Sequence, residues 1–182
     1  MMENLSWGLK QDSSLQAELD RVTDRAIQKV IDRKITPEKL KSESGVASER
    51  AELKLSRSSF EDQAAIAKLF GQQPFRFSGF ELIYDRTPDF FSLLKARGNA
   101  STVITARLGK SDDLWGLGSL SVRDGFMGDE RTRVAYLGDL RMLLSRNTAR
   151  VWRQLYSQIL QDVASELGVR GFLTAIGGDN TA

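Results

Sequence analysis

Three arginines at the start of one predicted helix form the clearest cluster of side chains that could do chemistry. Arg146, Arg150 and Arg153 follow one another at steps of four and three residues, so they share one helix face. Positive charge at a helix N-terminus opposes the helix dipole, which implies a compensating partner. Guanidinium groups pair well with phosphate oxygens, so the cluster indicates either a phosphate site or a basic stripe that faces solvent or a protein partner.

The residue types that are missing restrict the chemistry further. The 182-residue chain contains no cysteine and no histidine. A thiolate nucleophile, an imidazole base and the usual zinc ligands are therefore excluded, and no spacing typical of metal ligands is present. Any catalysis must use carboxylates, Tyr, Lys, Ser or Thr side chains, or backbone groups.

The composition is that of an ordinary domain, with 41% hydrophobic and 27% charged residues, which is enough to build one sizeable core. A net charge of only +2 supplies no bulk attraction for nucleic acid. The N-terminus shows no signal-peptide pattern, and no apolar run is long enough to span a bilayer. The sequence therefore predicts a cytoplasmic protein that binds neither nucleic acid nor membrane.

The first part of the chain, residues 1–50, is predicted to be a helix followed by a linker. Apolar residues recur at steps of four and three from Leu15 to Val30, which predicts an amphipathic helix over 13–33, capped by Ser13 or Ser14. Its narrow apolar stripe must pack on the remaining domain or on a second copy of the chain.

The second part, residues 51–182, is predicted to be one mixed domain. A strand, two short helices, a three-strand meander, a long helix and a final buried strand follow one another. The predicted ranges are 53–56, 59–71, 87–98, 103–108, 114–123, 133–144, 146–167 and 171–176.

This order of elements resembles the GNAT acyltransferase domain up to its fifth strand. The opening at 51–69 resembles the first strand and acidic, Ala-rich first helix of that family, and 114–119 resembles the third strand. Tyr-Leu-Gly-Asp-Leu-Arg-Met at 136–142 resembles the fourth strand of a bacterial GNAT subgroup, and 179–182 resembles the Asn-x-x-Ala that follows the fifth strand.

The resemblance implies an α/β (α+β) fold with a mixed, mainly antiparallel sheet flanked by helices, to which the N-terminal amphipathic helix is added. A GNAT domain normally continues with a further helix and hairpin. We therefore expect the domain to be incomplete at its C-terminus, either as a piece of a longer protein or as a domain that a partner completes.

The resemblance also implies an acyl-CoA cofactor, acetyl-CoA or another. In this family a Gln/Arg-x-x-Gly-x-Gly/Ala loop holds the CoA pyrophosphate with backbone amides at a helix N-terminus. Here Thr148 and Arg150 stand where small residues are expected and crowd that space, whereas arginine side chains could pair the phosphates instead. The cofactor-binding residues that the resemblance implies are Met142, Leu144, Ser145, Arg146, Asn147, Thr148, Ala149, Arg150, Val151 and Asn180.

Two functions follow from the resemblance. The first is acyl-CoA-dependent N-acyl transfer to an unknown amine, with Asp139 as the catalytic group that takes the ammonium proton. The alternative for Asp139 is a bond to backbone where the third and fourth strands splay. The second function is a non-catalytic GNAT-like module for ligand sensing, dimerisation or support of a downstream domain. A homodimer could form through the N-terminal helix or the open edge of the strand at 171–176.

Overall fold

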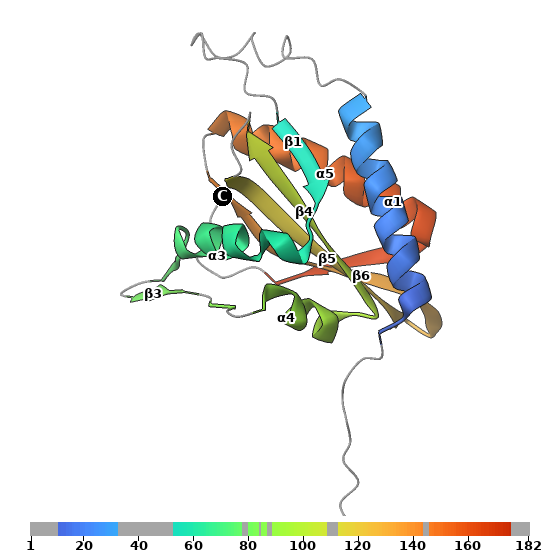
Figure 1. Ribbon diagram of the computed structural model, residues 1–182. Helices are drawn as coiled ribbons and strands as arrows, with labels where there is room; N and C mark the ends of the chain where they lie inside the picture. Colours follow the sequence, from blue (N-terminus) through green and yellow to red (C-terminus); the bar gives the residue numbers. More distant parts are fainter. Residues whose placement is uncertain are drawn as a thin grey trace, which may run out of the picture.

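The computed structural model describes residues 11–32, 53–77, 80–83, 85–86, 89–108, 113–143 and 146–175 (Figure 1). Five strands form one sheet in the order β1-β4-β5-β6-β7. All neighbours are antiparallel except β6 and β7, which confirms the mixed, mainly antiparallel fold predicted from the sequence. These strands are β1 (Leu53–Arg57), β4 (Ala100–Leu108), β5 (Leu114–Met127), β6 (Glu130–Met142) and β7 (Val169–Thr174).

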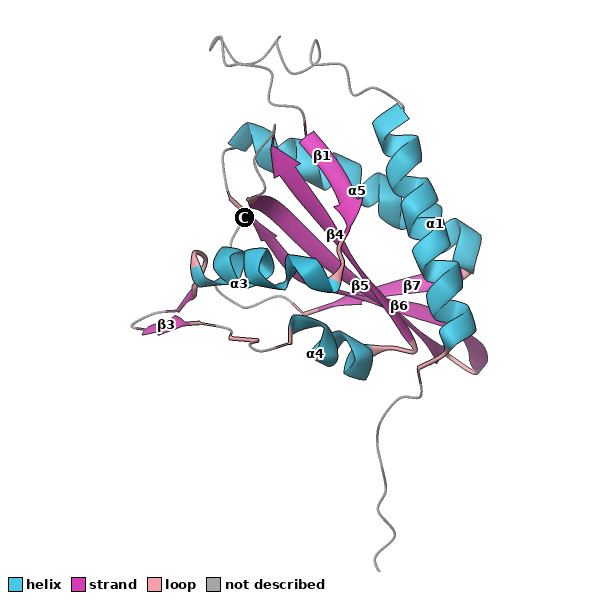
Figure 2. Cartoon of the chain, viewed as in Figure 1, coloured by secondary structure: helices cyan, strands magenta, loops and turns pink. Residues whose placement is uncertain are grey.

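Helices cover both faces of this sheet, as the colouring in Figure 2 shows. In Figure 1, α3 and α4 lie in front of the sheet, α5 passes behind it and α1 runs along one side. The helices are α1 (Ser13–Asp32), α3 (Gln63–Gly71, after the 3-10 turn η1, Phe60–Asp62), α4 (Phe90–Arg97) and α5 (Arg146–Leu167), and β2 (Phe75–Phe77) pairs with β3 (Phe80–Leu82) in a separate hairpin. The helices that the structure describes are all too short or too polar to cross a membrane.

Each face of the sheet has its own hydrophobic core. The larger core joins α1, α5 and the back of the sheet, and its fully buried members include Leu19, Trp152 and Ile159. The smaller core joins α3, α4 and the front of the sheet around Ile66 and Phe90. The site described below lies on this second face.

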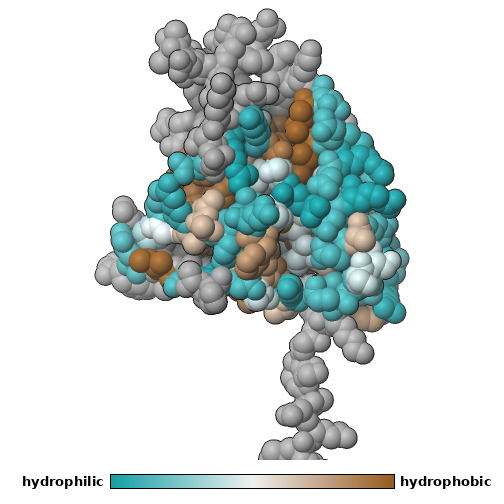
Figure 3. Space-filling view, in the orientation of Figure 1, coloured by the Kyte–Doolittle hydropathy of each residue, from teal (hydrophilic) through white to brown (hydrophobic). Residues whose placement is uncertain are grey.

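The predicted N-terminal helix is confirmed as α1, and its apolar stripe packs on the same chain. Its buried side chains contact α5 and the sheet, while its outer surface is hydrophilic (Figure 3). The cap predicted at Ser13 or Ser14 is wrong, because the Oδ1 atom of Asp12 accepts from the backbone N–H groups of Ser14 and Leu15 at 2.9 and 3.0 Å. A carboxylate at this position reaches two amides that the helix leaves unpaired.

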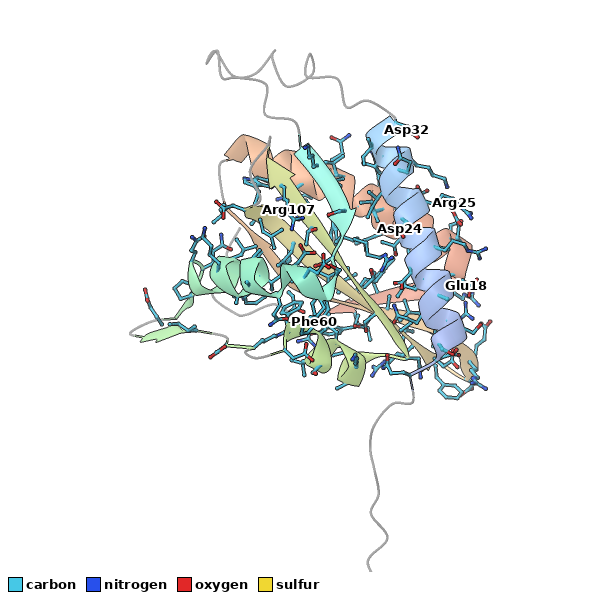
Figure 4. The ribbon with its side chains drawn as sticks, viewed as in Figure 1. Glu18, Asp24, Arg25, Asp32, Phe60 and Arg107 are labelled. Carbon is cyan, nitrogen blue, oxygen red and sulfur yellow. The ribbon has the colours of Figure 1, made fainter. Side chains whose placement is uncertain are left out.

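Polar contacts fasten α1 and α3 to the sheet. The Arg57 guanidinium on β1 pairs at 3.0 Å with Asp24 on α1, which Figure 4 labels. Arg107 on β4, labelled in the same view, donates to Asp62 at the start of α3.

The last strand differs from its prediction. Its apolar, glycine-bounded sequence predicted a buried strand at 171–176, whereas β7 is mostly exposed, with Phe172 at 42% and Leu173 at 49%. In the described part of the chain only β6 lies beside it. Burial of a strand depends on what covers its faces, and a short apolar run does not encode that cover.

Candidate functional site

A bulge near the end of β6 shapes the candidate site. One residue of β5, Gly118, stands opposite two residues of β6, Asp139 and Leu140. Asp139 has a φ of 56° and is the one non-glycine residue with positive φ in the described ranges. Such a backbone conformation is uncommon outside glycine, although aspartate tolerates it better than most residues. The bulge turns the carboxylate towards the face that carries α3 and α4.

The Asp139 carboxylate is buried in a network of donors, with only 5% of the side chain exposed. Its Oδ2 atom accepts from Arg97 Nη1 at 2.7 Å, from Ser119 Oγ at 2.7 Å and from Arg86 Nη1 at 3.1 Å. Its Oδ1 atom accepts from Arg86 Nη2. Both carboxylate oxygens are therefore held by cations or by a hydroxyl before any substrate arrives.

Two glycines lie closely against side chains of this network. A Cβ atom at Gly138 would lie 2.8 Å from Arg97 Nη1, so a larger residue there would require the guanidinium to shift from this position. The Arg97 guanidinium also lies over the Tyr136 ring, 5.4 Å from its centroid. On the other face, a Cβ at Gly118 would lie 2.7 Å from the ring of Tyr156.

Tyr156 on α5 connects the back of the sheet to the same network. Its hydroxyl donates to the Ser119 carbonyl at 3.2 Å, while the Ser119 side chain donates to Asp139. Burial raises the pKa of Tyr156, and the negative charge of Asp139 raises that pKa further. The phenol is therefore neutral at physiological pH and acts as a fixed hydrogen-bond donor.

A third arginine lies next to the network. The Arg141 guanidinium lies 5.1 Å from the centroid of the Phe70 ring, and the Arg86 guanidinium lies 5.9 Å from the same centroid. Burial lowers the pKa of Arg141; the charge of Asp139 opposes this shift and that of Arg86 adds to it. The positive charge of Arg141 therefore lies in a partly buried position, where water hydrates it incompletely.

A cavity of about 200 Å³ lies beside the network, and Arg86 is the arginine of the network that lines it. Its walls come from α3, from the segment after β3 and from the start of α4, and they include Phe70, Ile83, Asp85, Arg86 and Phe90. A larger cavity of about 430 Å³ lies between α1, α4 and β4. None of the arginines of the network lines the larger cavity, so we place the candidate site at the smaller one.

The end of β6 leads directly to a helix N-terminus. The pairing of β6 with β7 runs from Arg133 to Leu137, and in the described part of the chain β6 then continues to Met142 without β7 beside it. The strands that diverge are therefore β6 and β7, whereas β5 and β6 stay paired as far as Met142. Helix α5 begins at Arg146, so amides of its first turn follow this edge.

The predicted cofactor residues are only partly described. Met142 is half-buried at the end of β6, and its carbonyl accepts from the Gln73 side chain. Residues 146–151 form the first turns of α5, and the structure describes their backbone but not their side chains. Leu144, Ser145 and Asn180 lie outside the described residues.

The sequence did not single out the donors around Asp139. Arg86 and Arg97 lie 53 and 42 residues before Asp139 in the chain, and Ser119 lies on another strand. Arg141 belongs to the quoted strand motif, and its position two residues after Asp139 was the one signal that could have indicated it.

Comparisons with known proteins identify the fold. No family model and no curated protein matches the sequence. An acetyltransferase from Trypanosoma brucei has a TM-score of 0.51 at 13% identity, over 70% of this chain and 84% of that one. Glucosamine-6-phosphate N-acetyltransferase from Arabidopsis thaliana has a TM-score of 0.50 at 14% identity, over 71% and 85% of the two chains.

A transcriptional regulator from Bacillus halodurans C-125 has a TM-score of 0.53 at 11% identity, over 71% of this chain and 85% of that one. At such identities the likeness shows the fold. The chain thus has the GNAT fold that its sequence predicted, an acetyltransferase-like fold of mixed sheet and flanking helices.

Proposed function

We propose that this chain is an acyl-CoA-dependent N-acyltransferase domain that acts on an amine. The observation that supports this function is the edge of β6 from Gly138 to Met142, beside which the described part of the chain places no strand, and which leads into the N-terminus of α5. Such an edge offers peptide groups to the amide-containing arm of CoA. The first turn of α5 offers unpaired amides and the positive end of a helix dipole to the phosphates.

CoA would supply the acyl group as a thioester, and residues 142–151 would hold it. The protein's own contribution is to orient the donor and the amine at the bulge. The neutral Tyr156 hydroxyl and the Ser119 side chain keep the bulge in one geometry.

Two roles remain for Asp139. The first role is the proton acceptor expected from the sequence. In that role, the amine would have to displace one of the four hydrogen bonds that the carboxylate already accepts. As a positioning residue, it keeps Arg86 and Arg97 beside the acceptor. The occupied oxygens favour positioning.

The pH dependence of acyl transfer separates the roles of Asp139. In folded Asp139→Asn protein, a lower kcat with an unshifted pH profile supports positioning. Loss of an ionisation from the kcat/KM profile supports proton transfer.

Calorimetric titration with acetyl-CoA tests the proposed function. If arginine side chains replace the loop glycines, Arg146→Ala or Arg150→Ala should each weaken binding by about 1.5–3 kcal/mol, the value of a hydrogen bond to a charged group. CoA that lacks its 3′-phosphate should bind less tightly than CoA. The matched control is Arg131→Ala, at the exposed start of β6. An affinity for acetyl-CoA that neither arginine substitution changes would contradict this account of the loop.

The second candidate function is a non-catalytic GNAT-like module. Thr148 and Arg150 at the glycine positions favour it, because a β-branched and a long side chain crowd the phosphate site. In that case the native chain should not bind acetyl-CoA. Thr148→Gly with Arg150→Gly should restore binding if crowding alone blocks the site, and continued absence of binding would leave the module as the better description.

A further inference from the structure

The carbonyl of Met142 lies on the edge of β6 to which the proposed function assigns the acyl donor. The backbone N–H of the next residue, Leu143, donates to the Trp115 carbonyl on β5 at 2.8 Å. Successive residues of a strand direct their peptide groups to opposite edges. The peptide groups of Met142 therefore point away from β5, towards the edge beside which the described part of the chain places no strand.

A side chain of the protein itself already binds to that carbonyl. The carboxamide N–H of Gln73, two residues after the end of α3, donates to the Met142 carbonyl oxygen. Both residues are half-buried, so water competes only partly for this bond. The arm of CoA also donates through amide N–H groups, so Gln73 and the acyl donor need the same acceptor. A carbonyl oxygen can accept two bonds, and the experiment must therefore separate replacement of Gln73 from binding beside it.

The backbone at Gln73 is held in place, whereas its side chain is attached through single bonds that can rotate. The backbone N–H of Gln73 donates to the Phe70 carbonyl at 3.1 Å, and the Phe70 side chain is buried in the smaller core. Pro74 follows, with a backbone angle that its ring restricts. Rotation of the Gln73 side chain is therefore the smallest movement that frees the Met142 carbonyl.

We propose that Gln73 is a gate for the amide arm of acyl-CoA. Its carboxamide holds the Met142 carbonyl, and the donor binds there only after this side chain has rotated away. The identity of the ligand rests on the proposed function. The measured affinity for acetyl-CoA is then the intrinsic affinity, reduced by the small fraction of molecules in which Gln73 is turned away.

Calorimetric titration of acetyl-CoA into Gln73→Met protein tests the gate. Methionine is also unbranched and of similar length but has no N–H group, so the change frees the carbonyl with little effect on packing. Gln73→Met should bind acetyl-CoA about two- to ten-fold more tightly than the native chain, the range for loss of a neutral hydrogen bond. The matched control is Gln72→Met, at the exposed neighbouring residue, which should leave the affinity unchanged. Equal or weaker binding by Gln73→Met would overturn the proposal.

A fragment of the cofactor shows whether the effect is local to the edge of β6. Adenosine 3′,5′-bisphosphate carries phosphates but lacks the amide arm, so Gln73→Met should bind it no more tightly than the native chain does. An equal gain in affinity for this fragment and for acetyl-CoA would show that the substitution acts away from the Met142 carbonyl, and would refute the gate.

The side-chain NH2 signals of Gln73 in the NMR spectrum of the native chain report its displacement directly, so this test remains if Gln73→Met fails to fold. Saturation with acetyl-CoA should move these signals towards those of the exposed Gln72 side chain, because the bond to Met142 is broken. Unmoved signals at saturation would show that acetyl-CoA binds beside Gln73 and not in its place, which would refute the gate.

The outcomes separate the gate from the proposed function. Acetyl-CoA binding that Gln73→Met does not strengthen refutes the gate and leaves the cofactor site in place. Binding by Gln73→Met but not by the native chain supports both the gate and the cofactor site. Absence of binding by either protein refutes the cofactor site, and the gate with it.

Discussion

Replacing Asp139 by asparagine should destabilise the fold far more than the same change at an exposed ion pair. Asparagine has almost the same shape and also tolerates positive φ, so the change removes charge without disturbing the bulge. It leaves Arg86, 6% exposed, and Arg97, 21% exposed, without the carboxylate that they share. Removal of one partner from a buried ion pair typically costs about 3–5 kcal/mol.

The matched control for this change lies on the same hairpin. Asp124 pairs with Arg131 at 2.9 Å, but the two side chains are 54% and 73% exposed. A surface pair of this kind contributes about 0–1 kcal/mol, so Asp124→Asn should be nearly neutral. The expected difference between the two variants is therefore about 2–5 kcal/mol, out of a total stability of about 5–15 kcal/mol.

Urea unfolding followed by circular dichroism measures this difference. The transition midpoint of Asp139→Asn should fall while the slope stays constant, which shows that stability changed and the unfolded state did not. In thermal unfolding, Tm should drop by roughly 6–20 °C, since each kcal/mol shifts Tm by roughly 2–4 °C at this chain length. If Asp139→Asn costs no more than Asp124→Asn, the carboxylate does not hold the arginines and our description of the network is wrong.

Three further predictions concern the two faces of the sheet. Leu19→Ala should lower the free energy of unfolding by about 2–5 kcal/mol because the side chain is fully buried, and an effect as small as that of Ile31→Ala, at a position 45% exposed, would show that α1 does not belong to the core. Gly118→Ala should lower the free energy of unfolding by about 1–3 kcal/mol in the same urea assay, because the added Cβ would clash with the Tyr156 ring. Gly71→Ala should not destabilise the fold, because a Cβ there has no atom within 4 Å. Burial raises the pKa of Tyr156, so the folded state favours the neutral phenol and stability should fall as pH rises above about 10, the pKa of an exposed tyrosine. The free energy of unfolding, measured at a series of alkaline pH values, should fall less for Tyr156→Phe than for the native chain. An identical fall in the two proteins would show that Tyr156 does not cause the loss of stability.

The elements of the fold could be predicted because they depend on local patterns. Apolar residues at steps of three and four marked α1 and α5, and turn residues between alternating segments marked the meander from β4 to β6. The order of the predicted elements therefore resembled that of the GNAT fold. The exposure of β7 was missed because it depends on neighbours that lie elsewhere in the chain.

The candidate site divides in the same way. The sequence by itself determined that a strand with Gly138, Asp139 and Arg141 runs into a helix that begins with arginines, and it excluded histidine and cysteine chemistry. Only the tertiary structure decided which groups the Asp139 carboxylate pairs with. A two-to-one bulge against Gly118 rotates the carboxylate, and arginines from distant segments reach it, because such contacts depend on how the chain packs in three dimensions rather than on any spacing along it.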